Sequence, residues 1–403
     1  MKRKPSDFVV DELLDDAIRA AVLDTPPAGT GHALYQLRKS GVTTPQAIAE
    51  IARRLRVPPG SIGYGGLKDR HAETSQHVTV PLSAGLRGAG PRNLDHRGWR
   101  MERLGWLDAP LNASAIAGNR FTIVVRGLND RAAKRMDRAA RLLAPAPGSL
   151  RIVNYFGDQR FGGADSRREL LAPHLMRGNF EKALRLAIAS PHRKDQRAVK
   201  EFRRAVSKAW GRWSAVLPDL PRCPERRVVE HLARHPDDFR GAFARLPSFT
   251  QTMAVEAYQS LLWNMTATRL VVDSCASRGE VIVADDPWGD LAFPAASIVP
   301  TDLATLELPL LAPGTELLDP WRSAAEAALA EEDIHLDDLR IPGLDRPFFG
   351  AARRSLLVDA TAFEMSATEP DETDPRDGRL QRGLRFTLPR GAYATVLLRA
   401  LGQ

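Results

Sequence analysis

One short run of the sequence brings together residue types that could do chemistry on a polyanionic substrate. In Tyr64-Gly65-Gly66-Leu67-Lys68-Asp69-Arg70-His71, a β-leaning, glycine-broken run ends in a carboxylate that stands between two cations. Glycines at a strand end let the backbone turn tightly or approach a ligand closely, and nearby cations favour the ionised form of a carboxyl group. Asp69 therefore has the properties of a nucleophile. A solvated turn after a strand explains the local pattern as well, so the rest of the chain has to decide.

A second segment could bind unpaired bases. Residues 151–163 place Tyr155, Phe156, Arg160 and Phe161 between glycines. Unpaired bases stack on aromatic rings and on guanidinium planes. An ordinary hydrophobic strand followed by a glycine turn explains the same pattern, and this segment alone leaves both interpretations open.

Cations recur every three or four residues between positions 193 and 212. They are Arg193, Arg197, Lys200, Arg204, Lys208 and Arg212, whereas Val199, Phe202 and Val206 form a different face. This periodicity predicts an amphipathic helix. Its cationic face is either solvated or a contact for a phosphate backbone, and the excess of cations over acids supports the second interpretation.

The overall composition is that of a globular protein with a basic balance. The 403 residues are 43% hydrophobic and 26% charged, and the chain is long enough for two domains or one large one. A net charge of +8 favours a polyanionic partner, nucleic acid before a membrane surface. No apolar run approaches the roughly 18 residues of a membrane span, and no secretory signal is recognisable. We therefore expect a cytoplasmic protein with no membrane partner.

Motifs for metals and common cofactors do not occur in the sequence. The two cysteines, Cys223 and Cys275, stand far apart and outside any zinc-binding spacing, which argues against a disulfide framework and a structural metal. The patterns GxxxxGK[ST], GxGxxG, HExxH and GxSxG are likewise missing from the sequence. We therefore expect chemistry that uses neither a cofactor nor a metal.

Hydrophobic patterning in the first part of the chain predicts strands and helices in no strict alternation. Strands are expected near residues 5–13, 33–39, 77–82 and 118–128. Thr43-Thr44-Pro45 predicts a helix start, and a second helix is expected from Asn129 or Asp130 to Pro145. The order favours an α+β fold with a mixed or antiparallel sheet over a doubly wound one.

The second part of the chain changes character. Residues 165–250 are expected to be helical and basic, a further helix follows Ser248, and residues 281–320 are β-rich. An acidic helix or helix pair is expected over residues 321–339, and residues 364–379 are expected to form a mobile surface loop. A strand, a Pro-Arg-Gly turn and a short apolar helix close the chain at residues 384–401.

Seven stretches spread over nearly the whole chain form one ordered pattern. They are Pro5-x-Asp7-Phe8-x-Val10-x-Glu12 with Lys2 before it, Gly31-His32-x-x-Tyr35 through Lys39 and Thr43/Thr44, Gly65 to Gln76, Gly118-Asn119-Arg120-Phe121-x-Ile123, Asn154 to Gly162, Tyr258-Gln259-Ser260-x-Leu262-x-Asn264, and Leu388 to Thr395. Taken in order, these stretches resemble the TruD family of tRNA pseudouridine synthases. The chain departs from the family at Gly31, where Glu is usual, and at Ala392, where Ser is common.

The resemblance implies an α+β fold in which a pseudouridine synthase catalytic domain with a mixed central sheet carries an inserted α/β TRUD domain. The catalytic domain would comprise residues 1–162 and 341–403, and the insertion residues 163–340, with its C-terminal edge left open. It further implies tRNA as the partner, with other structured RNA as a further partner. We expect a monomer.

The resemblance also implies roles for individual residues. Asp69 would be the catalytic aspartate that isomerises a flipped-out uridine of tRNA, at position 13, to pseudouridine without a cofactor. Phe121 would stack on the target base and Asn119 would hold it. Lys2 and Glu12 would orient the substrate or the aspartate loop, and Lys68, Arg70 and His71 would hold the carboxylate. Tyr155 and Arg160 complete the expected substrate-binding set.

Two questions stay open at this point. The aspartate could attack the sugar, attack the base, or act as a base in a glycal route. Two other classes of protein also fit the composition: an RNA-binding protein without catalysis, and a nucleic-acid glycosylase or nuclease. A pure binding protein gains nothing from an anion at Asp69, and a glycosylase or nuclease would release a base or break the strand.

Overall fold

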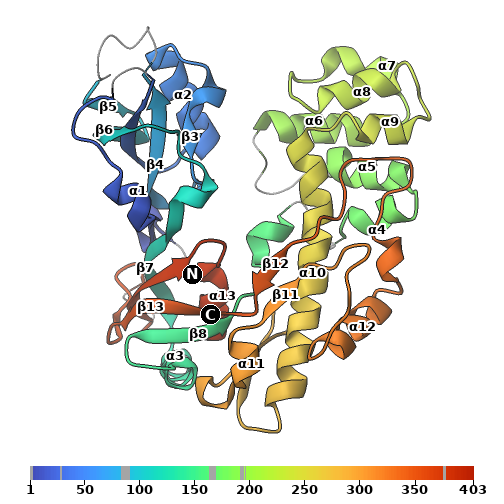
Figure 1. Cartoon of the computed structure of the whole chain (residues 1–403). Helices are drawn as coiled ribbons and strands as arrows, with labels where there is room; N and C mark the ends of the chain where they lie inside the picture. The colour runs from blue at the N-terminus through green and yellow to red at the C-terminus, as the bar shows by residue number, and fades with distance from the viewer. Residues whose placement is uncertain are drawn as a thin grey trace. The chain divides into compact units, whose positions relative to one another are not determined.

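The computed structural model describes residues 3–27, 30–82, 91–162, 169–190, 195, 197–374 and 378–403. The chain folds as two compact units, and the second is inserted into the first (Figure 1). The first unit comprises Met1–Ile152 and Val358–Gln403, and the second Val153–Leu357. The second unit is longer at both ends than the insertion 163–340 that the resemblance implies. Residues 153–162 and 341–357 belong to the second compact unit. The domain limits predicted from the resemblance stay a prediction.

The first unit is built on one large mixed sheet. Its strand order is β5-β6-β2-β4-β1-β7-β15-β13-β8, with β3 pairing β4 and β14 pairing β15. The pairing of β1 with β4 is parallel, whereas β1 with β7 and β2 with β4 are antiparallel. The predicted α+β fold with a mixed central sheet is therefore confirmed. The strands are β1 Phe8–Leu14, β2 His32–Lys39, β3 Gly63–Tyr64, β4 Glu73–Pro81, β5 Asn93–His96, β6 Trp99–Leu107, β7 Ile116–Leu128, β8 Ser149–Val153, β13 Leu357–Met365, β14 Glu369–Pro370 and β15 Leu380–Pro389.

The helices of the first unit are α1 Asp16–Ala20, α2 Thr44–Leu55, α3 Asp130–Leu143 and α13 Ala394–Ala400. Helix α2 begins where the sequence predicts it, because the Thr43 hydroxyl accepts a hydrogen bond from the Gln46 backbone N–H and the Gln46 side chain returns to Thr43. Helix α3 is capped by Asn129, whose side-chain oxygen accepts from the Ala132 backbone N–H. Both predicted helix starts are thus confirmed.

Helix α2 covers one face of the sheet and builds a core there. Its residues Ile48, Ile51 and Leu55 are buried against Tyr35 and Leu37 of β2 and against residues of β4 and β6. Because side chains alternate across a strand, residues 35, 37 and 39 of β2 share the face that α2 covers. This alternation places Lys39 at the same buried layer, and its exposed fraction is 4%.

The segment 364–379, predicted as a surface loop, lies at the surface in most of its described part, although it also contains the end of β13 and the whole of β14. The surface prediction is wrong at one described residue, Asp371. Asp371 is fully buried, and its carboxylate accepts hydrogen bonds from the Gly127 backbone N–H at 2.9 Å and the Thr373 hydroxyl at 2.6 Å. It also pairs with the buried Arg126 at 3.2 Å, and Arg126 reaches Asp7 at 2.8 Å. The acid is buried because a distant arginine neutralises it, which the local composition cannot reveal. Residues 375–377 lie outside the described part of the chain.

The second unit mixes helices with two-stranded sheets. Figure 1 shows the long helix α10, Ser248–Cys275, running the length of this unit. The other helices are α4 Ala172–Met176, α5 Phe180–Ala189, α6 Arg197–Lys208, α7 Trp213–Val216, α8 Arg226–Leu232, α9 Phe239–Phe243, α11 Thr301–Ala304 and α12 Arg322–Glu331. The strands are β9 Val281–Ala284, β10 Leu291–Pro294, β11 Glu307–Pro309 and β12 Arg353–Ser355. The predicted helices after Ser248 and in the acidic segment are confirmed.

Helix α6 carries four of the six cations of the predicted stripe, namely Arg197, Lys200, Arg204 and Lys208, whereas Arg212 follows the helix and precedes α7. Phe202 and Val206 are the buried residues of α6, and the face with Arg204 and Lys208 is exposed, so the amphipathic interpretation is confirmed. Arg193 lies outside the described residues. In the described part of the chain, no helix is both long enough and apolar enough to span a membrane.

Candidate active site

The loop between β3 and β4 carries Asp69, and several side chains fix its backbone. The Lys68 N–H donates to the Thr44 hydroxyl at 3.1 Å, and the same hydroxyl donates to Gln76 at 2.8 Å. Gln76 in turn donates to the carbonyl of Gly66 at 3.4 Å. The start of α2 and the strand β4 therefore hold the loop from both sides.

The two ends of the loop are also fixed, one by hydrogen bonds at Arg70 and the other by close packing at Gly65. Arg70 and Gly41 exchange hydrogen bonds: the guanidinium Nε donates to the Gly41 carbonyl at 2.9 Å, and the Gly41 N–H donates to the Arg70 carbonyl at 2.9 Å. At the other end of the loop, a Cβ on Gly65 would lie 2.1 Å from Ile116 Cγ1. Glycine is required there because the loop passes directly over β7.

Asp69 itself is exposed to solvent. Its Oδ1 accepts a hydrogen bond from the His71 backbone N–H at 2.9 Å, so the carboxylate is oriented by the turn that follows it. Its backbone carbonyl accepts a hydrogen bond from Lys39 Nζ at 3.2 Å. The structure thus presents a carboxylate that is accessible, oriented and surrounded by a fixed backbone.

Lys68 points away from the loop into a buried polar cluster. Its Nζ lies 2.7 Å from Glu12 Oε2 and donates to Asn119 Oδ1 at 2.8 Å. Glu12 and Asn119 are direct partners in the antiparallel pair of β1 and β7. The other carboxylate oxygen of Glu12 accepts from the His77 backbone N–H at 2.8 Å. The structure therefore brings together three of the predicted site residues in one cluster.

This cluster is charged although it is buried. The Glu12 side chain is fully buried, and burial alone would raise its pKa, but hydrogen bonds from His77 and the charge of Lys68 lower the pKa below its usual value. Glu12 is therefore ionised at neutral pH, and its carboxylate is a counter-charge 2.7 Å from the ammonium of Lys68. Such a pair has a fixed geometry, because each partner is costly to leave alone.

Phe121 stands two residues from Asn119 on the same face of β7. Its ring is stacked on Phe386 with centroids 5.3 Å apart and makes an edge contact with Phe8 at 6.0 Å. Its exposed fraction is 7%. The ring is thus held rigidly in the first unit, near Asn119, and its stacking on a substrate base stays a prediction.

The predicted residues Tyr155 and Arg160 belong to the second unit. Tyr155 is fully buried, and its hydroxyl donates to the Ala292 carbonyl at 2.9 Å and accepts from the Ala292 N–H at 3.1 Å. Arg160 pairs with Glu256 at 2.8 Å. The burial of Tyr155 shows that its ring is part of the hydrophobic core of the second unit. A role of Tyr155 and Arg160 in substrate binding stays a prediction. Lys2 lies outside the described residues.

The side chains of Lys39 and Gln76 hold the backbone of the aspartate loop, and neither was assigned a role from the sequence. Both stood inside the resembling stretches, but nothing local shows that their side chains reach the aspartate loop. The alternation of side chains in β2 could have predicted that Lys39 is buried, because it puts this lysine on the same face as the core residues Tyr35 and Leu37. Within the described residues, no three His, Cys, Asp or Glu side chains are grouped so that they could hold a metal ion.

The chain is similar to known proteins over nearly its whole length. Residues 1–401 match the profile of the family described as tRNA pseudouridine synthase D (TruD). A protein named tRNA pseudouridine synthase D from Aquifex aeolicus is 30% identical over 413 residues, covering 100% of this chain and 97% of that protein. A protein named Probable tRNA pseudouridine synthase D from Methanopyrus kandleri is 31% identical over 376 residues, covering 92% of this chain and 85% of that protein.

The fold has a counterpart among solved structures. A crystal structure from Methanosarcina mazei named "Putative tRNA pseudouridine synthase D (TruD)" superposes with a TM-score of 0.65 at 23% sequence identity, covering 99% of this chain and 92% of that chain. At this identity the likeness concerns the fold alone. With the family profile matched over residues 1–401, the chain belongs to the tRNA pseudouridine synthase D (TruD) family.

Proposed function

We propose that this protein isomerises a uridine of tRNA, at position 13, to pseudouridine, with Asp69 as the catalytic carboxylate. Family membership supports the activity, and one observation supports the residue: Asp69 is an exposed carboxylate on a loop with a fixed backbone. Lys39 and Gln76 donate hydrogen bonds to carbonyls of this loop, and the Thr44 hydroxyl accepts one from its Lys68 N–H. A flexible surface turn has no use for such a framework, whereas a reacting group needs it.

The reaction asks three things of the protein. The glycosidic bond must break, the uracil must rotate, and a bond must form from its C5 carbon. Because the target base is stacked in RNA, it has to be extruded toward Asp69. In this proposal Asn119 and Phe121 contact the extruded base, and the Glu12–Lys68 pair fixes the position of Asn119.

An aspartate serves each of three routes: attack on the sugar, attack on the base, and proton abstraction leading to a glycal. A tRNA with a 2′-fluoro substituent at the target uridine, followed by mass spectrometry of the protein–RNA adduct and its products, discriminates among them. The proposed chemistry uses no cofactor. The proposed partner is tRNA, together with other structured RNA, and the proposed state is a monomer.

The decisive test is single-turnover pseudouridine mapping on an unmodified tRNA transcript with the purified protein. We expect pseudouridine at position 13, no product with Asp69→Ala or Asp69→Asn, and retained tRNA binding by both variants. A matched transcript with cytidine at position 13 is the control.

Each competing class predicts a different product. Released base or cleaved strands would identify a glycosylase or nuclease. Binding without any product by the wild-type protein would identify a pure RNA-binding protein. A fully active Asp69→Ala variant would refute the assignment of the aspartate.

A further inference from the structure

Lys39 is buried at a place where a lysine is rare. Its exposed fraction is 4%, and buried lysines are almost always paired. Its Nζ donates to three backbone carbonyls: Val42 at 3.1 Å, Lys68 at 3.0 Å and Asp69 at 3.2 Å. An ammonium has three N–H donors, so these acceptors use its full capacity. Two of them are consecutive carbonyls of the aspartate loop.

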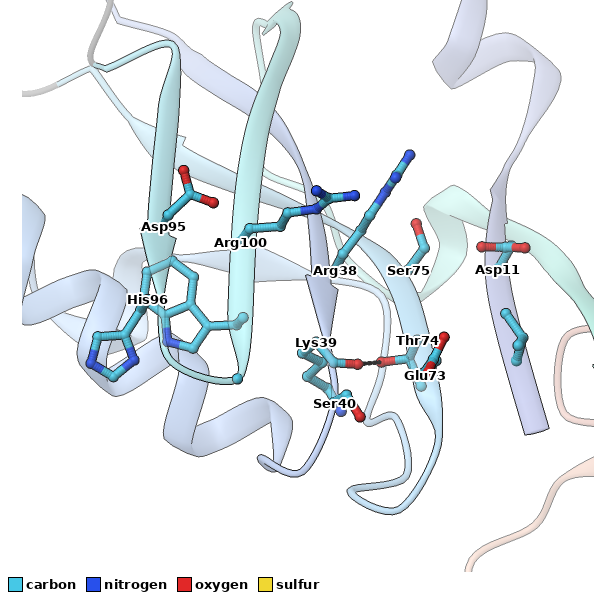
Figure 2. Close-up of a pocket in the computed structure, with 13 residues that line it drawn as sticks. Asp11, Arg38, Lys39, Ser40, Glu73, Thr74, Ser75, Asp95, His96 and Arg100 are labelled. Carbon is cyan, nitrogen blue, oxygen red and sulfur yellow. Dashed lines mark hydrogen bonds between the residues drawn. The ribbon is translucent and has the colours of Figure 1, made fainter. Parts of the chain in front are cut away.

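The position of Lys39 is fixed by the sheet. In β2 it stands opposite Thr74 of β4 and Trp99 of β6. Figure 2 shows Lys39 beside Thr74, whose hydroxyl lies 3.5 Å from the Lys39 carbonyl. The ammonium therefore ties a loop peptide to a strand in the middle of the sheet. Fixing the carbonyl of Asp69 also fixes the direction in which its side chain leaves the backbone.

We propose that Lys39 is a positioning residue for catalysis: its ammonium clamps the peptides of Lys68 and Asp69, and loss of its proton releases the aspartate loop. The proposal rests on the function proposed above. A neutral amine has only two N–H donors for three carbonyls, and its lone pair would face an oxygen. Deprotonation therefore removes a hydrogen bond and replaces it with a repulsion.

The surroundings of Lys39 bring its pKa into a pH range in which the enzyme can be assayed. Burial lowers the pKa of Lys39 to about 8; the negative charge of Asp69 opposes the shift and the positive charge of Lys68 adds to it. A cavity that Lys39 helps to line is also lined by Asp11 on β1, Arg38 on β2, Glu73 on β4, Asp95 and His96 on β5, and Arg100 on β6 (Figure 2). Because side chains alternate along a strand, Arg38 and its partner Arg100 lie on the opposite face of the sheet from the Lys39 ammonium. The loop also contributes Arg70, which is bound to Gly41.

The test is the pH dependence of the single-turnover rate for wild type, Lys39→Met and Lys39→Arg. We expect the wild-type rate to fall above about pH 8 while tRNA binding stays constant. Lys39→Met should lower the rate at pH 7 by roughly 10- to 100-fold, because a misplaced catalytic group costs that order of magnitude, and its residual rate should no longer fall above pH 8. Lys39→Arg keeps a charge and should retain more activity than Lys39→Met.

Lys134→Met is the matched control, because Lys134 is an exposed lysine on α3 in the same unit. It should leave the rate and the pH profile unchanged. An alkaline limb that survives in Lys39→Met, or a fully active Lys39→Met, would overturn the inference while leaving the proposed function intact. A wild-type protein that makes no pseudouridine would instead refute the proposed function.

A second measurement covers the case in which Lys39→Met fails to fold. In the wild-type protein, the backbone N–H of His71 is bonded to Asp69 and that of Lys68 to Thr44. Release of the loop should lower the hydrogen-exchange protection factors of both amides between pH 7 and 9.5, after correction for the intrinsic rate. The Ala132 amide at the start of α3 should keep its protection. Constant protection at His71 and Lys68 would refute the clamp.

Discussion

The substitution Glu12→Gln removes one charge from a buried pair and changes almost nothing else. Glutamine keeps an oxygen that can accept the His77 N–H, which the glutamate accepts at 2.8 Å. Its amide nitrogen, however, would face Lys68 Nζ, which now lies 2.7 Å from Glu12 Oε2. Two donors then point at each other, and the ammonium of Lys68, 10% exposed, loses its counter-charge.

The magnitude follows from the burial of both partners. Removing one member of a buried ion pair costs about 3–5 kcal/mol, because the remaining charge stays desolvated without compensation. Removing both members and filling the space with an apolar side chain costs much less. We therefore expect Glu12→Gln to lower the free energy of unfolding by about 3–5 kcal/mol, and Glu12→Gln combined with Lys68→Met to recover a large part of that loss.

The assay is urea denaturation at pH 7 followed by a double-mutant cycle on Glu12 and Lys68. The matched control is Asp16→Asn, which removes an exposed partner of Arg19, a pair with side-chain exposures of 93% and 67%. Solvent screens that pair, so its loss should leave the denaturation midpoint unchanged. The reasoning is refuted if Glu12→Gln unfolds at the wild-type urea concentration. It is equally refuted if adding Lys68→Met brings no recovery.

Two further predictions concern packing away from the aspartate loop. Burial alone would raise the pKa values of Asp7 and Asp371, but backbone N–H groups and Arg126 lower both, and the Thr373 hydroxyl also lowers that of Asp371. Their stabilising effect is therefore complete above the unfolded-state pKa of about 3.9 and is lost as pH falls below it. The thermal midpoint of the wild type should therefore fall more steeply between about pH 4 and 2 than that of Arg126→Met; parallel curves would contradict this. Tyr155→Phe should lower the free energy of unfolding by about 1–3 kcal/mol through the lost contacts with Ala292, with unchanged tRNA binding. Weaker tRNA binding at wild-type stability would instead support its predicted role at the substrate.

The local elements of this protein follow from its sequence because local chemistry determines them. Thr43 caps α2 and Asn129 caps α3, and both signals lie within a few residues of the helix they begin. The alternation in 33–39 predicts β2, and the β-branched run before Leu128 predicts β7. The resembling stretches indicate the family and the aspartate loop from the sequence alone.

The tertiary structure decided which distant residues meet. The pairing of β1 with β7 sets Glu12 opposite Asn119, and only then can Lys68 reach both. The composition near Asp371 predicted a surface loop. The carboxylate of Asp371 is buried nevertheless, because it pairs with Arg126, which is far away in the sequence.

Charge alternation around Asp69 drew attention to its sequence neighbours Lys68 and Arg70. The ammonium that binds the carbonyl of Asp69 belongs instead to Lys39, on a strand that is adjacent to the loop only in three dimensions. Residue type and local spacing therefore determined the elements, and the family resemblance singled out Asp69 as the proposed catalytic carboxylate. Strand register determined what holds that carboxylate in place, because register joins residues whose separation along the chain carries no local signal.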